Sequence, residues 1–128
     1  MTLNDKSKER LRKMNNLLVS KLEETFNVNV YQDYVSEDEE KGYHYFIFET
    51  GGFTSTSKDY TLTQDVLVRY YSENLDDLDE RALDVISVIK DIGYTFENTN
   101  KTAIQKGDTD AYIDEIEFYF KRVVKYGS

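Results

Sequence analysis

The 128-residue sequence contains no cysteine, no tryptophan and one histidine. Without cysteine the chain can form no disulfide, thiolate nucleophile, iron–sulfur cluster or cysteine-type zinc site, and a reducing, cytosolic setting is the simplest expectation. No apolar run approaches the roughly 18 residues that a membrane span needs, and residues 1–22 hold no apolar core of signal-peptide length. We therefore expect a soluble, intracellular protein with no membrane partner.

Positive charge is scarce and unevenly placed. The formal net charge is −9, which argues against specific binding to a nucleic-acid backbone, because that binding needs clustered lysine and arginine. The basic residues crowd the two ends of the chain, as Lys6, Lys8, Arg10, Arg12 and Lys13 near the N-terminus and Lys121, Arg122 and Lys125 near the C-terminus. The termini are thus basic and the middle of the chain is acidic.

The clearest pattern lies between Leu62 and Gly93, where a period-two strand pattern runs straight into a period-3.6 helix pattern. Asp77 and Glu80 have the spacing of a capping box at the start of this helix. Gly93 is placed to take the left-handed conformation that ends it. Strand and helix are expected to pack as neighbours on one core within a single domain, residues 1–128.

The remaining patterns complete an α+β domain. Apolar spacing predicts a helix from Asn4 to Phe26, with Leu11, Met14, Leu18 and Leu22 on one face and Leu17 widening it. Alternation and β-forming residues predict strands at 27–34, 42–50, 61–73, 94–96 and 111–124, separated by polar segments at 36–41, 53–59 and 97–109, the last a loop or an extended edge. Eleven tyrosines and seven phenylalanines suit half-buried strand surfaces. The order α-β-β-β-α-β-β predicts a mainly antiparallel sheet of four to five strands with two helices packed on one face.

No residue pattern predicts catalysis or a cofactor. His44, the only histidine, lies in a strand pattern and cannot build a catalytic triad or a multi-histidine metal site within one chain. Asp108 and Asp110 have a spacing that could hold Mg²⁺ or Ca²⁺, but the twelve-residue calcium-loop pattern is absent. Gly51 and Gly52 follow a strand without a helix N-terminus behind them, so a phosphate cradle lacks its dipole. We expect no catalytic, cofactor-binding or metal-ligating residues and no enzyme.

Two segments carry a family resemblance. The run VLVRYYSENLDDLDERALDVISVIKDIGYTF (residues 66–96) and the terminal strand DEIEFYFKRVV (residues 114–124), together with the order of elements, resemble the tail-completion or tail-terminator proteins of long-tailed bacteriophages and prophages. The resemblance covers about the last half of the chain. It implies a ring, usually of six subunits, that caps the tail tube and joins it to the head–tail connector, in the virion and, during assembly, in the host cytoplasm.

The resemblance also suggests which residues form interfaces. DNA that passes through a lumen lined by carboxylates finds no phosphate partners, so acidity would help it slide. The loops 36–41 and 53–59 would face the lumen or the neighbouring ring, while Arg122 and Lys125 would pair with acidic groups of an adjoining subunit. The final strand and the strand 61–73 are the candidates for edge-to-edge contact, unless both are internal. The interface candidates are Glu37, Asp38, Glu39, Glu40, Phe53, Ser55, Lys58, Arg122 and Lys125.

Two other functions stay open. A small acidic inhibitor that mimics DNA would present a carboxylate-rich face, and Asp76, Asp77, Asp79, Glu80 and Asp84 could begin one, although a helix N-terminus already attracts such residues. A small adaptor that binds one partner helix or strand is the third possibility.

Overall fold

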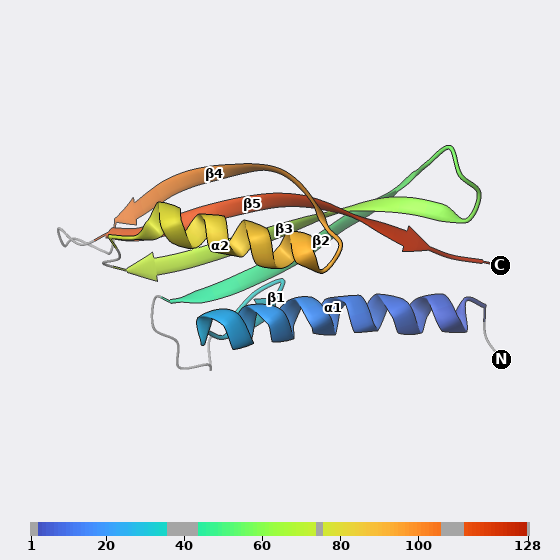
Figure 1. Ribbon diagram of the computed structural model, residues 1–128, viewed down its shortest axis with the longest axis horizontal. Helices are drawn as coiled ribbons and strands as arrows, with labels where there is room; N and C mark the ends of the chain where they lie inside the picture. The colour runs from blue at the N-terminus through green and yellow to red at the C-terminus, as the bar shows by residue number, and fades with distance from the viewer. Residues whose placement is uncertain (1–2, 36–43, 74–75, 106–111, 128) are drawn as a thin grey trace.

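The computed structural model describes residues 3–35, 44–73, 76–105 and 112–127. These residues form two helices and five strands, α1 (Asp5–Phe26), β1 (Val30–Gln32), β2 (Tyr45–Ser55), β3 (Thr61–Glu73), α2 (Leu78–Asp91), β4 (Thr95–Gln105) and β5 (Tyr112–Lys125). The strands make one mixed sheet in the order β1-β2-β3-β5-β4, in which only β1 and β2 run parallel. The α+β fold, the element order and the helices packed on the sheet are as predicted (Figure 1).

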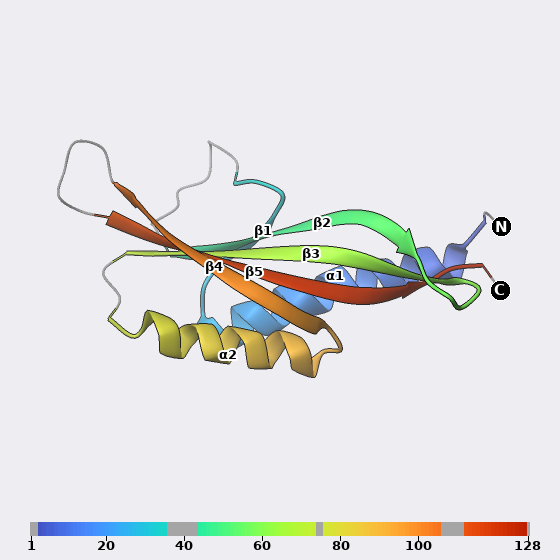
Figure 2. The same ribbon diagram turned by 90° about the horizontal axis from the view of Figure 1, so that it is seen from above.

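One face of the sheet forms the core with both helices (Figure 2). The strand alternation buries one side of each central strand, and the helix spacing buries one stripe of each helix. The largest fully buried side chains are Leu18 and Leu22 of α1, Val85 and Ile89 of α2, and Phe46, Phe48, Val66, Val68, Tyr70, Ile116, Phe118 and Phe120 of the sheet. Leu17 is 42% exposed, so the prediction that it widens the apolar face of α1 was wrong. It lies about 100° around the helix from Leu18, away from the sheet.

The β2–β3 hairpin is longer than the sequence predicted. Gly51 and Gly52 do not end the strand, because Phe53, Thr54 and Ser55 pair with Gln64, Thr63 and Leu62 after a register shift between Thr50 and Phe53. Glycines at a shift of this kind are typical of a β-bulge. The expected loop at 53–59 therefore starts later, after Ser55, and the hairpin projects toward the end of the molecule where both termini lie (Figure 1).

The ends of α2 follow the sequence in part. Asp77 occupies the N-cap position, but its side chain makes no capping hydrogen bond and approaches Arg81 at 3.5 Å instead. The predicted capping box is therefore not formed. Gly93 has a φ of 102°, which confirms the predicted left-handed residue after the helix. This turn sends the chain back along the sheet as β4.

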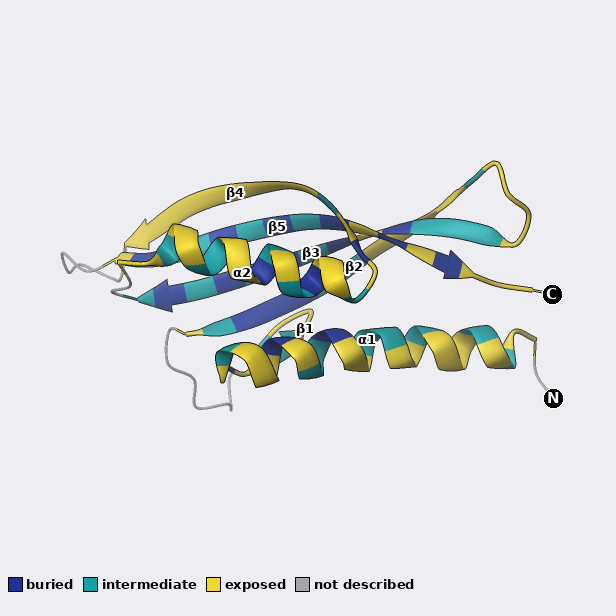
Figure 3. Cartoon of the chain, in the orientation of Figure 1, coloured by how far each residue is buried: buried dark blue, intermediate teal, exposed yellow. Residues whose placement is uncertain are grey.

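Strand β4 is longer than the predicted strand at 94–96. Of the two alternatives for the polar segment that follows, loop or extended edge, the described part is an extended edge, because β4 pairs with β5 from Thr95 to Gln105. Its residues beyond Phe96 are exposed on both faces (Figure 3). The two candidate edge strands, β3 and β5, each have a neighbour on both sides, so the alternative that both are internal holds. The sheet ends in β1 and β4 instead.

Candidate interaction surfaces

The hairpin tip, the start of α1 and the end of β5 form one end of the molecule. The backbone N–H of Tyr126 donates to the carbonyl of Tyr60 at 3.1 Å, and the N–H of Gly127 donates to the Asn4 side chain at 2.7 Å. These contacts join three segments that are far apart in the sequence. We call this end, which comprises residues 3–14, 53–62 and 123–127, the basic end.

Four of the predicted interface residues meet at the basic end. Phe53 is 53% exposed, Ser55 pairs with Leu62 beside it, and Thr61 pairs with Lys125, while Lys58 lies in the turn between β2 and β3. Exposed apolar side chains accompany them, namely Leu3, Tyr60, Val123 and Tyr126. The sequence did not indicate this cluster, because it forms only when hairpin and termini are brought together.

Arg122 belongs to the interior and does not join this group. Its side chain is only 2% exposed. It donates to Gln64 Oε1 at 2.9 Å, to Asn15 Oδ1 at 2.8 Å and to the Tyr94 hydroxyl at 2.9 Å. The prediction that Arg122 pairs with an adjoining subunit therefore does not fit its position. Strand alternation explains this, because Arg122 follows the buried Ile116, Phe118 and Phe120 at the same period of two.

Acidic residues gather at the opposite end. Here β3 ends, α2 begins and β5 begins, since Glu73 pairs with Ile113. The acidic residues are Glu73, Asp76, Asp77, Asp79, Glu80, Asp114 and Glu115, and we call them the acidic end. Figure 1 shows the start of α2 at the far end of the molecule from both termini. Charge thus separates along the strand direction, basic at one end and acidic at the other.

Two cations partly neutralise the acidic end. Lys101 Nζ lies 2.8 Å from Asp79 Oδ1, and Arg81 Nε lies 3.5 Å from Asp77 Oδ2. Both pairs are solvent-accessible and add little stability. Because they interrupt the run of carboxylates with positive charge, they weaken the resemblance of this cluster to a phosphate backbone. The other carboxylate candidates, Glu37, Asp38, Glu39 and Glu40, lie outside the described residues.

The sheet face opposite the helices carries tyrosines and carboxylates. Arg69 lies between Glu49 at 3.1 Å and Glu117 at 3.6 Å. Tyr71 stacks on Tyr45 with ring centroids 5.0 Å apart. Burial, followed by a hydrogen bond to Glu115, raises the pKa of Tyr71 to about 12. We call this surface the open face.

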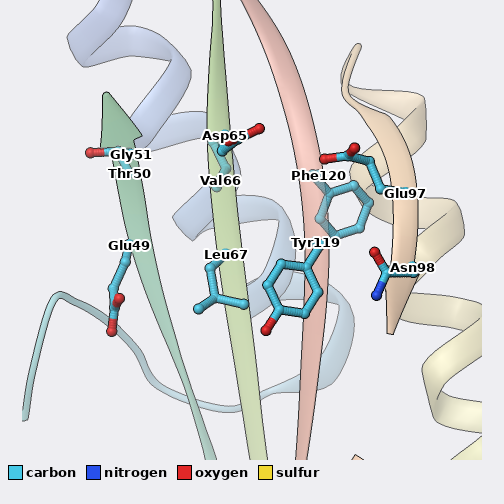
Figure 4. A pocket seen from close by; sticks show the side chains of 10 residues that line it. All are labelled: Glu49, Thr50, Gly51, Asp65, Val66, Leu67, Glu97, Asn98, Tyr119 and Phe120. Atoms are coloured by element: carbon cyan, nitrogen blue, oxygen red, sulfur yellow. The ribbon is translucent and has the colours of Figure 1, made fainter. Parts of the chain in front are cut away.

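A shallow hollow of about 290 Å³ crosses the open face between β2 and β4. Figure 4 shows Leu67 and Tyr119 on its floor, with Asp65 and Glu97 toward one end. Lys121 lies 3.6 Å from Asp65 and 3.4 Å from Glu97. The hollow therefore combines an apolar floor with a mixed-charge rim, which suits contact with another protein surface.

His44 is the one titratable imidazole, and it contacts a core tyrosine. Its Nε2 lies 2.5 Å from the Tyr70 hydroxyl. Partial burial and, to a lesser degree, the nearby Arg81 lower the pKa of His44. Among the described residues, no group of three or more histidine, aspartate or glutamate side chains could hold a metal ion; Asp108 and Asp110 lie outside them.

Comparisons with known proteins do not assign the chain to a family. No protein-family model matches it, and no curated protein matches its sequence. Within the described ranges, neither helix is long and apolar enough to cross a membrane.

Proposed function

We propose that this chain is a structural subunit of a phage tail terminator, which closes into a ring on the end of the tail tube and joins it to the head–tail connector. The observation that carries the proposal is the pair of sheet edges that lack a strand neighbour along most of their length. Among the described residues, the outer side of β4 has none, and β1 covers β2 only at Phe46, Ile47 and Phe48. Open edges of this length are surfaces for strand addition.

Charge supports the same role. A ring forms from two different surfaces of one chain that fit each other and close after a full turn. The basic end and the acidic end provide two such surfaces of opposite sign. The carboxylates of the open face, including Glu49, Glu115 and Glu117, would give a lumen that does not hold DNA. The ring would reside in the virion and be assembled in the host cytoplasm.

The experiment compares the purified protein alone and with tubes assembled from the tube protein of the same genome. Light scattering measures its mass, and negative-stain electron microscopy of the mixture shows whether rings cap the tube ends. We expect closed rings at tube ends, even if the free protein is a monomer. Bare tube ends at saturating protein would refute the proposal. Binding to a DNA-binding protein that weakens as salt rises would favour the DNA-mimic alternative instead.

A further inference from the structure

The two open edges of the sheet run in opposite directions. β4 is antiparallel to β5, β5 to β3, and β3 to β2, so β4 runs antiparallel to β2. In a cyclic ring every copy has the same orientation relative to the axis. If β4 of one copy lies beside β2 of the next, the two strands are therefore antiparallel, which is the more stable pairing.

The parts of β4 and β2 that form the open edges lie at different positions along the strand direction. Thr50, Val66, Phe120 and Phe96 stand in one row across the sheet. From this row β4 extends toward the acidic end, whereas the open part of β2, Glu49–Ser55, extends toward the hairpin tip. The two stretches can meet only if neighbouring copies are displaced along the strands by about five to seven residues, or ~17 to 23 Å.

Closed sheets require a displacement of this kind. The four strands that each copy would contribute, β2, β3, β5 and β4, are ~19 Å wide at about 4.8 Å per strand. A displacement of ~17 to 23 Å over that width tilts the strands by ~40 to 50° from the ring axis, which overlaps the tilt of about 35–45° found in closed β-barrels. The geometry of the two edges is therefore compatible with closure into a ring.

We propose that β4 of one copy pairs with Glu49–Ser55 of β2 in the next copy, so that the sheets form a continuous barrel inside the ring. This inference rests on the proposed ring function and assigns its subunit contact. The displacement also matches the charges. Since α1 contacts β1 and α2 contacts β4, it moves the basic first half of one α1 toward the acidic start of the neighbouring α2. The helices then lie on the outer side of the ring, where the circumference is larger, and the open face lines the lumen.

Engineered disulfides test the pairing in a background without native cysteine. Thr54 pairs with Thr63 and Asn100 pairs with Glu117, which places both on the open face. Within one copy β3 and β5 separate the two residues, by ~14 Å across the sheet alone at the usual strand spacing, so no internal disulfide can form. A Thr54→Cys, Asn100→Cys variant can therefore oxidise only between copies.

Three double variants test the register of β4 against β2 of the next copy. In each, Thr54→Cys is combined with one of Asn98→Cys, Asn100→Cys and Thr102→Cys. We expect the Asn100→Cys combination, which corresponds to a displacement of about six residues within the proposed ~17 to 23 Å, to give a ladder of covalent oligomers on tube-bound rings at least tenfold stronger than the other two, because a disulfide requires closely opposed Cβ atoms. A strongest ladder from either of the other two contradicts the proposed displacement. Each single-cysteine variant is the matched control and should give at most dimers. Rings without a ladder from any of the three overturn the pairing while leaving the ring itself intact. Dimers of the single β4 variants in place of ladders also overturn it, because they indicate a symmetric β4–β4 contact. Bare tubes contradict the ring, and with it the pairing.

Proline substitution provides a second readout. Of two neighbouring strand residues, one N–H faces β5 and the other faces outward, and proline is tolerated in an edge strand only at the outward one. Thr99→Pro and Asn100→Pro therefore form a matched pair. We expect one of them to keep the wild-type Tm and yet lose ring formation. Rings at wild-type yield from that folded variant refute the proposal.

Discussion

Replacing Arg122 by alanine should destabilise the fold more than any surface change. The guanidinium ties three parts of the chain together, because it bonds Asn15 of α1, Gln64 of β3 and Tyr94 after α2 at 2.8–2.9 Å. Gln64 in turn donates to the carbonyl of Gly51 at 2.9 Å. This buried polar network therefore connects the bulge of β2 to the long helix.

The expected loss of unfolding free energy follows from the polar groups that Arg122→Ala leaves without a hydrogen-bond partner. Hydrogen bonds that involve a charged group contribute about 1.5–3 kcal/mol each, and a buried polar atom left without a partner costs about 1–3 kcal/mol. Alanine removes three such bonds and also leaves a cavity, while local rearrangement and water entry recover part of the loss. We expect Arg122→Ala to lower the free energy of unfolding by about 4 kcal/mol, and Arg122→Lys by about 2 kcal/mol, since one ammonium cannot reproduce the planar fork.

Urea denaturation followed by far-UV circular dichroism measures the free energy of unfolding of both variants. The slope of that free energy against urea concentration should stay at the wild-type value. Lys125→Ala is the matched control, because Lys125 is exposed in the same strand and should change stability by less than about 0.5 kcal/mol. A double-mutant cycle with Asn15→Ala should give a coupling above about 0.5 kcal/mol. A loss below about 1 kcal/mol for Arg122→Ala would refute the reasoning.

Three further predictions concern single residues. Gly93→Ala should cost about 1 kcal/mol, because φ is 102° and a Cβ there meets nothing within 4 Å, so only backbone strain remains; Gly52→Ala, where a Cβ also meets nothing, is the control and should leave Tm nearly unchanged. The pKa of Tyr71 is raised to about 12 in the folded state, so as pH rises above 10 the Tyr71 hydroxyl ionises in the unfolded chain before it does so in the folded protein. Stability should therefore fall between pH 10 and about 12, and the fall should be smaller in Tyr71→Phe. His44, whose pKa is lowered, charges more readily in the unfolded state, so stability should fall as pH drops below about 6.5; a proton-NMR titration of its ring that gives a value at or above 6.5 contradicts this.

Periodicity predicted the parts of the fold that have one buried and one exposed side. The alternation in 61–73 and 111–124 and the apolar spacing in both helices depend directly on burial, and the order of elements followed from them. The same alternation could also have predicted the burial of Arg122 and Gln64, because each continues the buried row of its own strand. Their charge and polarity obscured that signal.

Strand β4 could not be predicted in this way. Beyond Phe96 neither of its faces is buried, so no side-chain alternation is selected, and the strand is held mainly by backbone hydrogen bonds to β5. Turn-forming residues such as Asn98 and Asn100 then dominate the local sequence. The open edges of the sheet were missed for a related reason, because they depend on which strands lie outermost. Whether a strand lies at an edge depends on the order of strands in the sheet, and the residues of one segment do not indicate that order.

The edges themselves are only partly protected against pairing. Natural sheets guard an edge with proline, lysine, bulges or a covering segment. This chain has no proline; β4 carries one lysine, Lys101, and a register shift near Phe96, and the open part of β2 has a shift between Thr50 and Phe53. Because Lys101 is engaged by Asp79 of α2 at 2.8 Å, it is held toward the helix layer and does not block the outer side of β4. In a free monomer, open edges with so little protection can pair with the strands of other chains and so cause aggregation. Pairing with a neighbouring copy in a closed ring would cover both edges and prevent this.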